Sequence, residues 1–237
     1  MYFLNEMIGT FLLVLLGDGV CCNVKLDGSG MKGGDTTHIA LGWGLAVLIP
    51  AFIFGTSTGA HLNPTVTLAM AANGTLDWAL VPQYIVGQML GGFLGAAFLI
   101  VLFHDQLKRT EDSVLKRGCF CTAPGIRNYW RNALSEITCS FVLVFAILGI
   151  GSTTAGVSAV NYLFVYAIIV SIGMSFGGLT GYSMNAARDF SPRVAFALFC
   201  PGKDKDPDWA YSWIPSIMPL IGGLLAVALF HCVTLAP

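Results

Sequence analysis

Two asparagines that are far apart in the chain stand in matching surroundings. Residues 59–65 read Gly-Ala-His-Leu-Asn-Pro-Thr, and residues 181–187 read Gly-Tyr-Ser-Met-Asn-Ala-Ala. Each asparagine, Asn63 or Asn185, directly precedes a short apolar segment, which is the place of a helix N-cap. The carboxamide could serve as a cap alone. Because the two asparagines form an in-register pair, we favour a second use, in which the N–H groups donate hydrogen bonds to a hydroxyl or a water molecule.

One arginine follows the second asparagine in an apolar part of the sequence. Residues 137–187 contain no Asp, Glu, Lys or Arg, and Arg188 comes directly after them. A charged side chain within a membrane is costly and is usually functional. The planar guanidinium donates two hydrogen bonds to a polar solute and repels cations. The alternative is an arginine that pairs with a loop carbonyl or anchors the chain at the membrane interface.

Two acidic residues lie at the start of similar apolar segments. Glu6 stands three residues before Gly9, and Glu136 stands three residues before Cys139. A carboxylate buried in apolar surroundings needs hydrogen-bond partners. The two interpretations at this point are a supporting role and a proton relay.

The chain shows no pattern of an enzyme or a metal site. Gly-x-Ser-x-Gly, His-Glu-x-x-His and a credible pair of catalytic acids are all absent, so we predict that it is not an enzyme. None of the 7 cysteines has convincing zinc-ligand spacing, and we expect free thiols, no metal and no cofactor. The net charge of −1 predicts no nucleic-acid partner.

The composition indicates the elements that position these residues. Hydrophobic residues make up 55% of the chain and charged residues 11%, whereas a soluble domain carries about 25% charged residues. Because a membrane span needs roughly 20 apolar residues, we predict an all-α membrane protein. The six expected transmembrane helices lie at residues 2–16, 39–56, 82–103, 133–150, 162–176 and 213–233.

Two apolar segments are too short to span a membrane. Residues 63–72 would form a helix of about 15 Å, half of a hydrocarbon core of about 30 Å. Residues 185–198 form the second such segment. Two half-helices that meet end to end would complete one span. Interrupted backbone at that depth is tolerated where protein shields it or where it lines a wet cavity.

The two halves of the chain repeat each other. Besides the asparagine motifs, a pair of glycines recurs at 91–92 and at 222–223. We expect a single domain over residues 1–237, with repeat one at 1–104, a linker loop at 105–127 and repeat two at 128–237. Three spans in each repeat make the second copy inverted. Paired interrupted segments of this kind point to a site near the membrane midplane.

The paired motifs resemble the Asn-Pro-Ala loops of the aquaporin (major intrinsic protein) family. The run Arg188-Asp189-Phe190 is similar to that of the bacterial glycerol facilitator, or aquaglyceroporin, branch. This chain has Asn-Pro-Thr and Asn-Ala-Ala instead of two Asn-Pro-Ala motifs, which affects how the two loops pack. The resemblance implies six transmembrane helices plus two half-helices, with these midplane motif residues: Asn63, Pro64, Thr65, Asn185, Ala186 and Ala187.

The resemblance also implies a selectivity filter. Its members are expected to be Trp43, Gly173, Tyr182 and Arg188. Gly173 occupies the position where strict water channels place a histidine, and the missing side chain is expected to widen the pore. Tyr182 stands where glycerol facilitators often have phenylalanine, and its hydroxyl adds polarity. The alternative for these aromatic and glycine residues is ordinary helix packing.

Loop support is the other role that the resemblance implies. In the family, the glutamates that match Glu6 and Glu136 accept hydrogen bonds from loop amides. His61 is expected to line the cytoplasmic vestibule, although a purely structural histidine is the alternative. Asp189 is expected to brace its loop without touching the solute.

The function that the resemblance implies is a passive channel for glycerol and similar small uncharged solutes, with water, that excludes protons and ions. Alternatives are the same fold tuned to water, urea, hydrogen peroxide, dihydroxyacetone or undissociated lactic acid, and an ion-coupled secondary transporter. The expected partners are the lipid bilayer and further copies of the chain in a homotetramer.

The expected location is the cell (plasma) membrane, as a multi-pass protein of a bacterial inner membrane with both termini in the cytoplasm. The basic residues conflict with this orientation. Nearly all of them lie on the loops 23–37, 105–127 and 203–208, which would then face outward, whereas Lys and Arg are normally enriched on cytoplasmic loops. Passive flux follows the gradient, so the function is the same in either orientation.

Overall fold

The computed structural model describes residues 1–153, 159–202 and 205–234, and its regular structure is helical. The helices are α1 (Tyr2–Lys25), α2 (Thr36–Thr58), α3 (Pro64–Ala72), the 3₁₀ turn η1 (Trp78–Leu80), α4 (Val81–Leu102), α5 (His104–Arg109), α6 (Ser113–Arg117), α7 (Tyr129–Thr153), α8 (Ala159–Thr180), α9 (Ala186–Phe199) and α10 (Trp209–Thr234). Within the described residues, 6 helices are long and apolar enough to cross a membrane. The predicted number of spans is therefore confirmed.

The first predicted span is too short. The glycines at positions 17 and 19 do not end the helix, and α1 continues to Lys25. A Cβ atom on Gly17 would lie 2.3 Å from Cζ3 of Trp43, so this glycine lets the indole pack closely against the helix. The predicted linker 105–127 also differs from expectation, because it contains the short helices α5 and α6. The loop expected at 203–208 lies partly outside the described residues.

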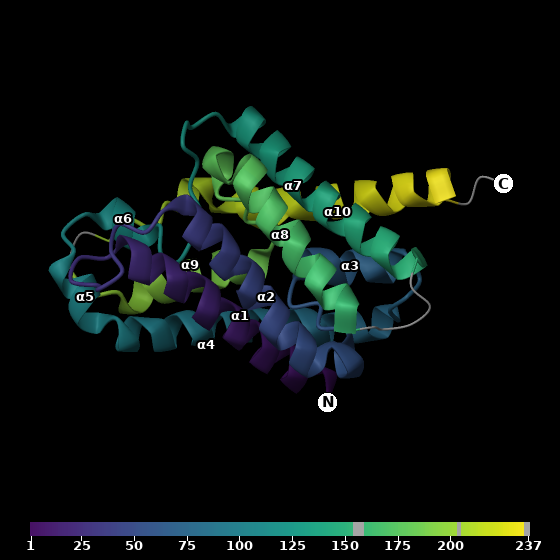
Figure 1. Cartoon of the computed structure of the whole chain (residues 1–237), viewed down its shortest axis with the longest axis horizontal. Helices are drawn as coiled ribbons and strands as arrows, with labels where there is room; N and C mark the ends of the chain where they lie inside the picture. The colour runs from purple at the N-terminus through teal and green to yellow at the C-terminus, as the bar shows by residue number, and fades with distance from the viewer. Residues whose placement is uncertain (154–158, 203–204, 235–237) are drawn as a thin grey trace.

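The two half-helices begin where the sequence predicts. Asn63 caps α3 and Asn185 caps α9, and both have extended backbone before the first helical turn. Pro64 occupies the first position of α3, where its fixed φ suits the start of a helix. Figure 1 shows α3 and α9 toward opposite ends of the helix bundle. Their N-termini therefore approach each other inside it.

The repeats pack across each other. α1 packs most extensively against α4, and α7 against α10, while α3 rests on α10 and α9 rests on α4. Each half-helix thus lies against the last long helix of the other repeat. A Cβ on Gly91 would lie 2.1 Å from the Met7 carbonyl oxygen, and one on Gly222 would lie 2.2 Å from that of Ile137. Glycine at these matching positions allows the backbones to approach closely.

Polar and apolar side chains are distributed as a membrane protein requires. All six long helices carry exposed large apolar residues, among them Leu4, Leu45, Val101, Leu134, Leu163 and Leu225. Several polar side chains are fully buried, including Glu6, Gln88, Glu136, Asp189 and Arg193. These polar side chains lie inside the bundle, where hydrogen bonds must satisfy them.

Candidate transport site

The two asparagines link the half-helices to each other. The side-chain oxygen of Asn63 accepts from the amide of Thr65 at 2.8 Å, and that of Asn185 accepts from the amide of Ala187 at 2.9 Å. Each Nδ2 donates to the opposite loop: Asn63 to the Met184 carbonyl at 2.9 Å, and Asn185 to the Leu62 carbonyl at 2.8 Å. A carboxamide has two N–H hydrogens, so one on each residue remains for a solute. This donor role stays a prediction.

The loops before the half-helices hold a costly backbone conformation. Ala60 and Leu62 have φ of 46° and 53°, and Tyr182 and Met184 have φ of 39° and 54°. Non-glycine residues rarely adopt positive φ, and each such residue costs of order 1–3 kcal/mol unless its surroundings hold it. The strain falls at matching places in the two repeats, directly before Asn63 and Asn185, so something must fix both loops.

Glu6 holds the first loop. Its Oε1 accepts from the Thr58 hydroxyl at 2.7 Å and the His61 amide at 3.1 Å. Its Oε2 accepts from the Leu62 amide at 2.7 Å and from Nε2 of Gln88 at 2.7 Å. The carboxylate therefore collects donors from the loop and from the neighbouring helix α4, which is the geometry expected of a support.

Glu136 holds the second loop in the same way. Its carboxylate oxygens accept from the amides of Ser183 at 3.1 Å and Met184 at 3.0 Å. The side chain is fully buried, as is that of Glu6. Both acids thus contact the strained residues that precede an asparagine. Their supporting role remains a prediction that this geometry favours over a proton relay.

Three of the expected filter residues face one cavity. The guanidinium carbon of Arg188 lies 4.1 Å from the centre of the Trp43 ring, which is close enough for a cation–π interaction. Trp43, Tyr182 and Arg188 line a cavity of about 880 Å³. The same cavity is lined by Asn63 and Asn185. The structure therefore brings the two asparagines, a charged donor and aromatic faces together on one cavity.

Gly173, the fourth expected filter residue, lies beside the ring of Tyr182. Of the four described filter residues, it alone does not line this cavity. A Cβ on Gly173 would lie 2.9 Å from Cζ of Tyr182, and a Cβ on Gly177 would lie 3.0 Å from Cδ1 of the same ring. The missing side chain leaves room for the tyrosine ring, and its effect on the width of the pore stays a prediction. The sequence could not show this, because residue 182 comes from another element.

Comparison with known proteins places the chain in a family. A profile of the Major intrinsic protein family matches residues 2–230. The chain belongs to the major intrinsic protein family. It is 44% identical over 230 residues, 97% of each chain, to a probable glycerol uptake facilitator protein of Thermotoga maritima. It is 42% identical over 222 residues to a glycerol uptake facilitator protein of Bacillus subtilis, covering 93% of this chain and 80% of that relative.

Two further comparisons bear on this major intrinsic protein. A D/L-lactic acid transporter of Lactiplantibacillus plantarum is 34% identical over 231 residues, which cover 95% of this chain and 94% of the relative. The solved structure of the aquaglyceroporin from Plasmodium falciparum superimposes with a TM-score of 0.87 at 27% identity, covering 99% and 97% of the two chains. The predicted aquaporin-like fold is confirmed, and these relatives are channels or transporters.

His61 lies in the part of the cavity nearer α3 and α4. Its Nδ1 is 3.2 Å from the Thr67 hydroxyl oxygen, and its ring centre is 4.9 Å from that of Tyr84. His61 also lines the cavity, together with Tyr84. This position is compatible with both roles that the sequence leaves open, a vestibule wall and a structural histidine, and both stay predictions.

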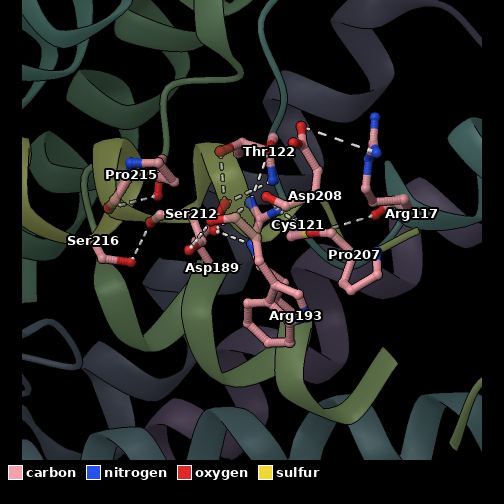
Figure 2. Close-up of polar contacts among 12 residues, drawn as sticks. Arg117, Cys121, Thr122, Asp189, Arg193, Pro207, Asp208, Ser212, Pro215 and Ser216 are labelled. Atoms are coloured by element: carbon pink, nitrogen blue, oxygen red, sulfur yellow. Dashed lines mark hydrogen bonds and ion pairs between the residues drawn. The ribbon is translucent and has the colours of Figure 1, made fainter. Parts of the chain in front are cut away.

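Asp189 is fully buried beside the filter, and its partners include two residues that sequence reasoning missed. Its Oδ1 accepts from Nη2 of Arg193 at 2.8 Å, and its Oδ2 accepts from the Thr122 hydroxyl at 2.6 Å. Figure 2 shows these side chains pointing toward one another. The spacing of four residues between Asp189 and Arg193 on one half-helix is a signal that could have revealed the pair. No local pattern indicates Thr122, which belongs to the connector between the repeats.

Proposed function

We propose that this major intrinsic protein is a passive channel for glycerol and other small uncharged solutes, and that water passes with them. The observation that carries the proposal is the arrangement of Arg188 against Trp43 with Tyr182 on the same cavity. One wall of the passage offers a fixed hydrogen-bond donor, and the others offer aromatic faces. The descriptions of the similar proteins of Thermotoga maritima and Bacillus subtilis as glycerol uptake facilitators support this function.

The filter suits a polyol for two physical reasons. Aromatic faces accept the carbon backbone of glycerol, while Arg188 and loop carbonyls pair with its hydroxyls. A hydroxyl that leaves water without a new partner costs about 1–3 kcal/mol. The site would offset that cost for a solute with one apolar edge and one hydroxylated edge. The proposed filter residues are Trp43, Tyr182 and Arg188, with Gly173 behind Tyr182.

The same passage would exclude protons and other cations. The N-termini of α3 and α9 meet where Asn63 and Asn185 each donate a hydrogen bond to a backbone carbonyl of the opposite loop. The N-terminus of a helix carries a partial positive charge, and Arg188 adds a full one. A cation would therefore meet a repulsive field at the midplane and at the filter. A neutral solute meets only hydrogen-bond donors and acceptors.

We further propose that the protein is a homotetramer with one pore in each subunit. We place it in a bacterial inner membrane with both termini in the cytoplasm. The six apolar helices and the family support a multi-pass membrane protein. Native mass spectrometry in detergent should report mainly tetramers, and a population of monomers alone would contradict this assembly.

A second candidate permeant is undissociated lactic acid, because a relative at 34% identity is described as a D/L-lactic acid transporter. Ion-coupled transport is less favoured, since the carboxylates of Glu6 and Glu136 are engaged by loop amides.

Stopped-flow light scattering on proteoliposomes tests the proposed permeants directly. Glycerol should enter faster through this protein than through empty liposomes, in proportion to the gradient and without saturation. A glycerol rate equal to that of empty liposomes would overturn the proposal, and saturation coupled to an ion gradient would favour a transporter. Lactic acid compared at acidic and neutral pH would show whether the neutral acid is a second permeant.

A further inference from the structure

Thr122 lies in the connector between α6 and α7, and α9 engages each of its polar groups. Its amide donates to Oδ2 of Asp189 at 2.7 Å, and its hydroxyl donates to the same oxygen at 2.6 Å. Its carbonyl accepts from Nη2 of Arg193 at 2.9 Å. The side chain is buried, and its polar contacts are drawn in Figure 2. A connector residue is thus fixed to the half-helix that carries Arg188.

The groups that hold Thr122 are themselves rigidly placed. Asp189 and Arg193 are completely buried, and Nε and Nη2 of Arg193 lie 3.2 Å and 2.8 Å from Oδ1 of Asp189. Arg193 also donates to the backbone carbonyls of Pro207 and Asp208, in the segment before α10. A buried ion pair is stable only when further hydrogen bonds complete it, and here they do. Asp189 directly follows Arg188, so this network fixes the backbone of a filter residue.

The methyl group of Thr122 lies close to the loop that carries Tyr182. A Cβ on Gly181 would lie 2.9 Å from Cγ2 of Thr122, and Gly181 directly precedes Tyr182. The φ of Gly181 is +83°, in the region where glycine is favoured. Nearby, the amide of Gly125 donates to the Leu179 carbonyl at 3.1 Å, which ties the connector to the end of α8. The connector therefore contacts both sequence segments that carry the filter.

We propose that Thr122 is a positioning residue of the selectivity filter. Its hydroxyl holds the residue next to Arg188, and its methyl group supports the glycine next to Tyr182. The separation between these two filter side chains then depends on the connector. The inference rests on the proposed function, because it deepens the account of how that filter discriminates among solutes.

Two conservative substitutions separate the two contacts. Thr122→Val keeps the branched shape and the methyl group but removes the hydroxyl from Asp189. Thr122→Ser keeps the hydroxyl and removes the methyl group that faces Gly181. Thr138→Val is the matched control, because Thr138 is exposed on α7 and its hydroxyl bonds only the Leu134 carbonyl of its own helix.

The experiment measures the ratio of glycerol to water permeability in proteoliposomes, together with amide hydrogen exchange over residues 178–190. We expect Thr122→Val to change the ratio by about fivefold, the equivalent of roughly 1 kcal/mol for a lost hydrogen bond. Thr122→Ser should change it less, and exchange should rise near Tyr182. The control should match the wild-type protein in both measurements.

Wild-type ratios and exchange in both Thr122→Val and Thr122→Ser would overturn the proposal. If Thr122→Val does not fold, Thr122→Ser decides, and unchanged values in that variant overturn it. Failure of the proposed function is a separate result, since the wild-type protein would then pass no glycerol. Amide hydrogen exchange can be measured without a permeant. Faster exchange at residues 181–190 in the variants would therefore still support the positioning role of Thr122, and unchanged exchange would overturn it.

Discussion

The two loops that carry Asn63 and Asn185 share one backbone conformation and differ in their side chains. Positive φ occurs at Ala60 and Leu62 in the first loop, and at Tyr182 and Met184 in the second. The first loop therefore has a methyl group where the second has an aromatic ring. The loops begin at Gly59 and Gly181. Eight residues before these glycines, repeat one has Ala51 and repeat two has Gly173, which leaves room for the Tyr182 ring.

The surroundings of the loops differ as well. Around the first loop, Glu6 is held by uncharged donors from Thr58, Gln88 and the backbone. Around the second, Asp189 and Arg193 add a buried ion pair that reaches the connector. The inverted repeat thus builds the same strained turn twice, while the charge and the aromatic ring belong to one copy. We therefore expect discrimination among solutes to depend on this second copy.

The largest expected effect comes from removing one of the glutamates that hold the two loops. In Glu6→Ala, the buried donors of Thr58, His61, Leu62 and Gln88 lose their acceptor. Each unsatisfied donor costs about 1–3 kcal/mol, which together approach the whole stability of a typical domain, about 5–15 kcal/mol. We expect little monodisperse protein in size-exclusion chromatography. Glu136→Ala should behave alike, and the exposed Glu111→Ala is the control. A normal yield of Glu6→Ala would show that the first loop keeps its conformation without the carboxylate.

Arg188→Val is expected to make the second loop resemble the first. The residue three positions after Asn63 is Val66, so this substitution copies the uncharged repeat. Removing the guanidinium beside Trp43 should loosen discrimination. We expect the glycerol-to-water permeability ratio to change by about tenfold, equivalent to roughly 1.4 kcal/mol. Planar-bilayer recording should also show more ion leak. An unchanged ratio with no leak would mean that the charge is dispensable.

A smaller effect is expected from copying the alanine of repeat one into α8. In Gly173→Ala the new methyl group would lie 2.9 Å from the Tyr182 ring, which must then move toward the passage. Overpacking of this kind typically costs about 1–3 kcal/mol. Glycerol permeability should fall more than water permeability, measured on the same liposomes. Gly178→Ala is the matched control, because a Cβ there meets no atom within 4 Å. Equal losses of glycerol and water permeability would argue against a role of Gly173 in positioning the Tyr182 ring.

The smallest expected effect concerns pH. Burial by itself raises the pKa of Asp208, but Arg127, Arg117 and Arg193 outweigh it, so the pKa lies below its ordinary value. A lowered carboxyl pKa stabilises the folded protein above the ordinary value of about 3.9, and this stabilisation is lost as the pH falls through the folded-state pKa. Asp208→Asn should therefore lower the midpoint of thermal unfolding at neutral pH and differ little from wild type near pH 2. A constant difference between the two proteins across this range would contradict the assignment.

Sequence reasoning predicted the parts of the fold that depend on local composition. Long uncharged runs indicate the six spans, and an asparagine before a short apolar segment indicates each half-helix start. It placed the end of α1 too early, because Gly17 and Gly19 look like helix-ending residues when no partner is visible. Gly17 serves instead to receive the Trp43 indole. A glycine can end a helix or allow a close contact within one, and only the residue packed against it shows which of the two applies.

The sequence by itself determined the membrane class, the repeat, the capping asparagines and the residue types offered to the passage. These follow from hydropathy, spacing and capping preference, which act over a few residues. Only the tertiary structure decided that each asparagine bonds the opposite loop, that Tyr182 fills the space beside Gly173, and that Thr122 joins Asp189 and Arg193. These contacts join residues from about 10 to more than 120 positions apart, for which the sequence carries no local pattern. Close packing and the need to satisfy buried polar groups select them once the helices assemble.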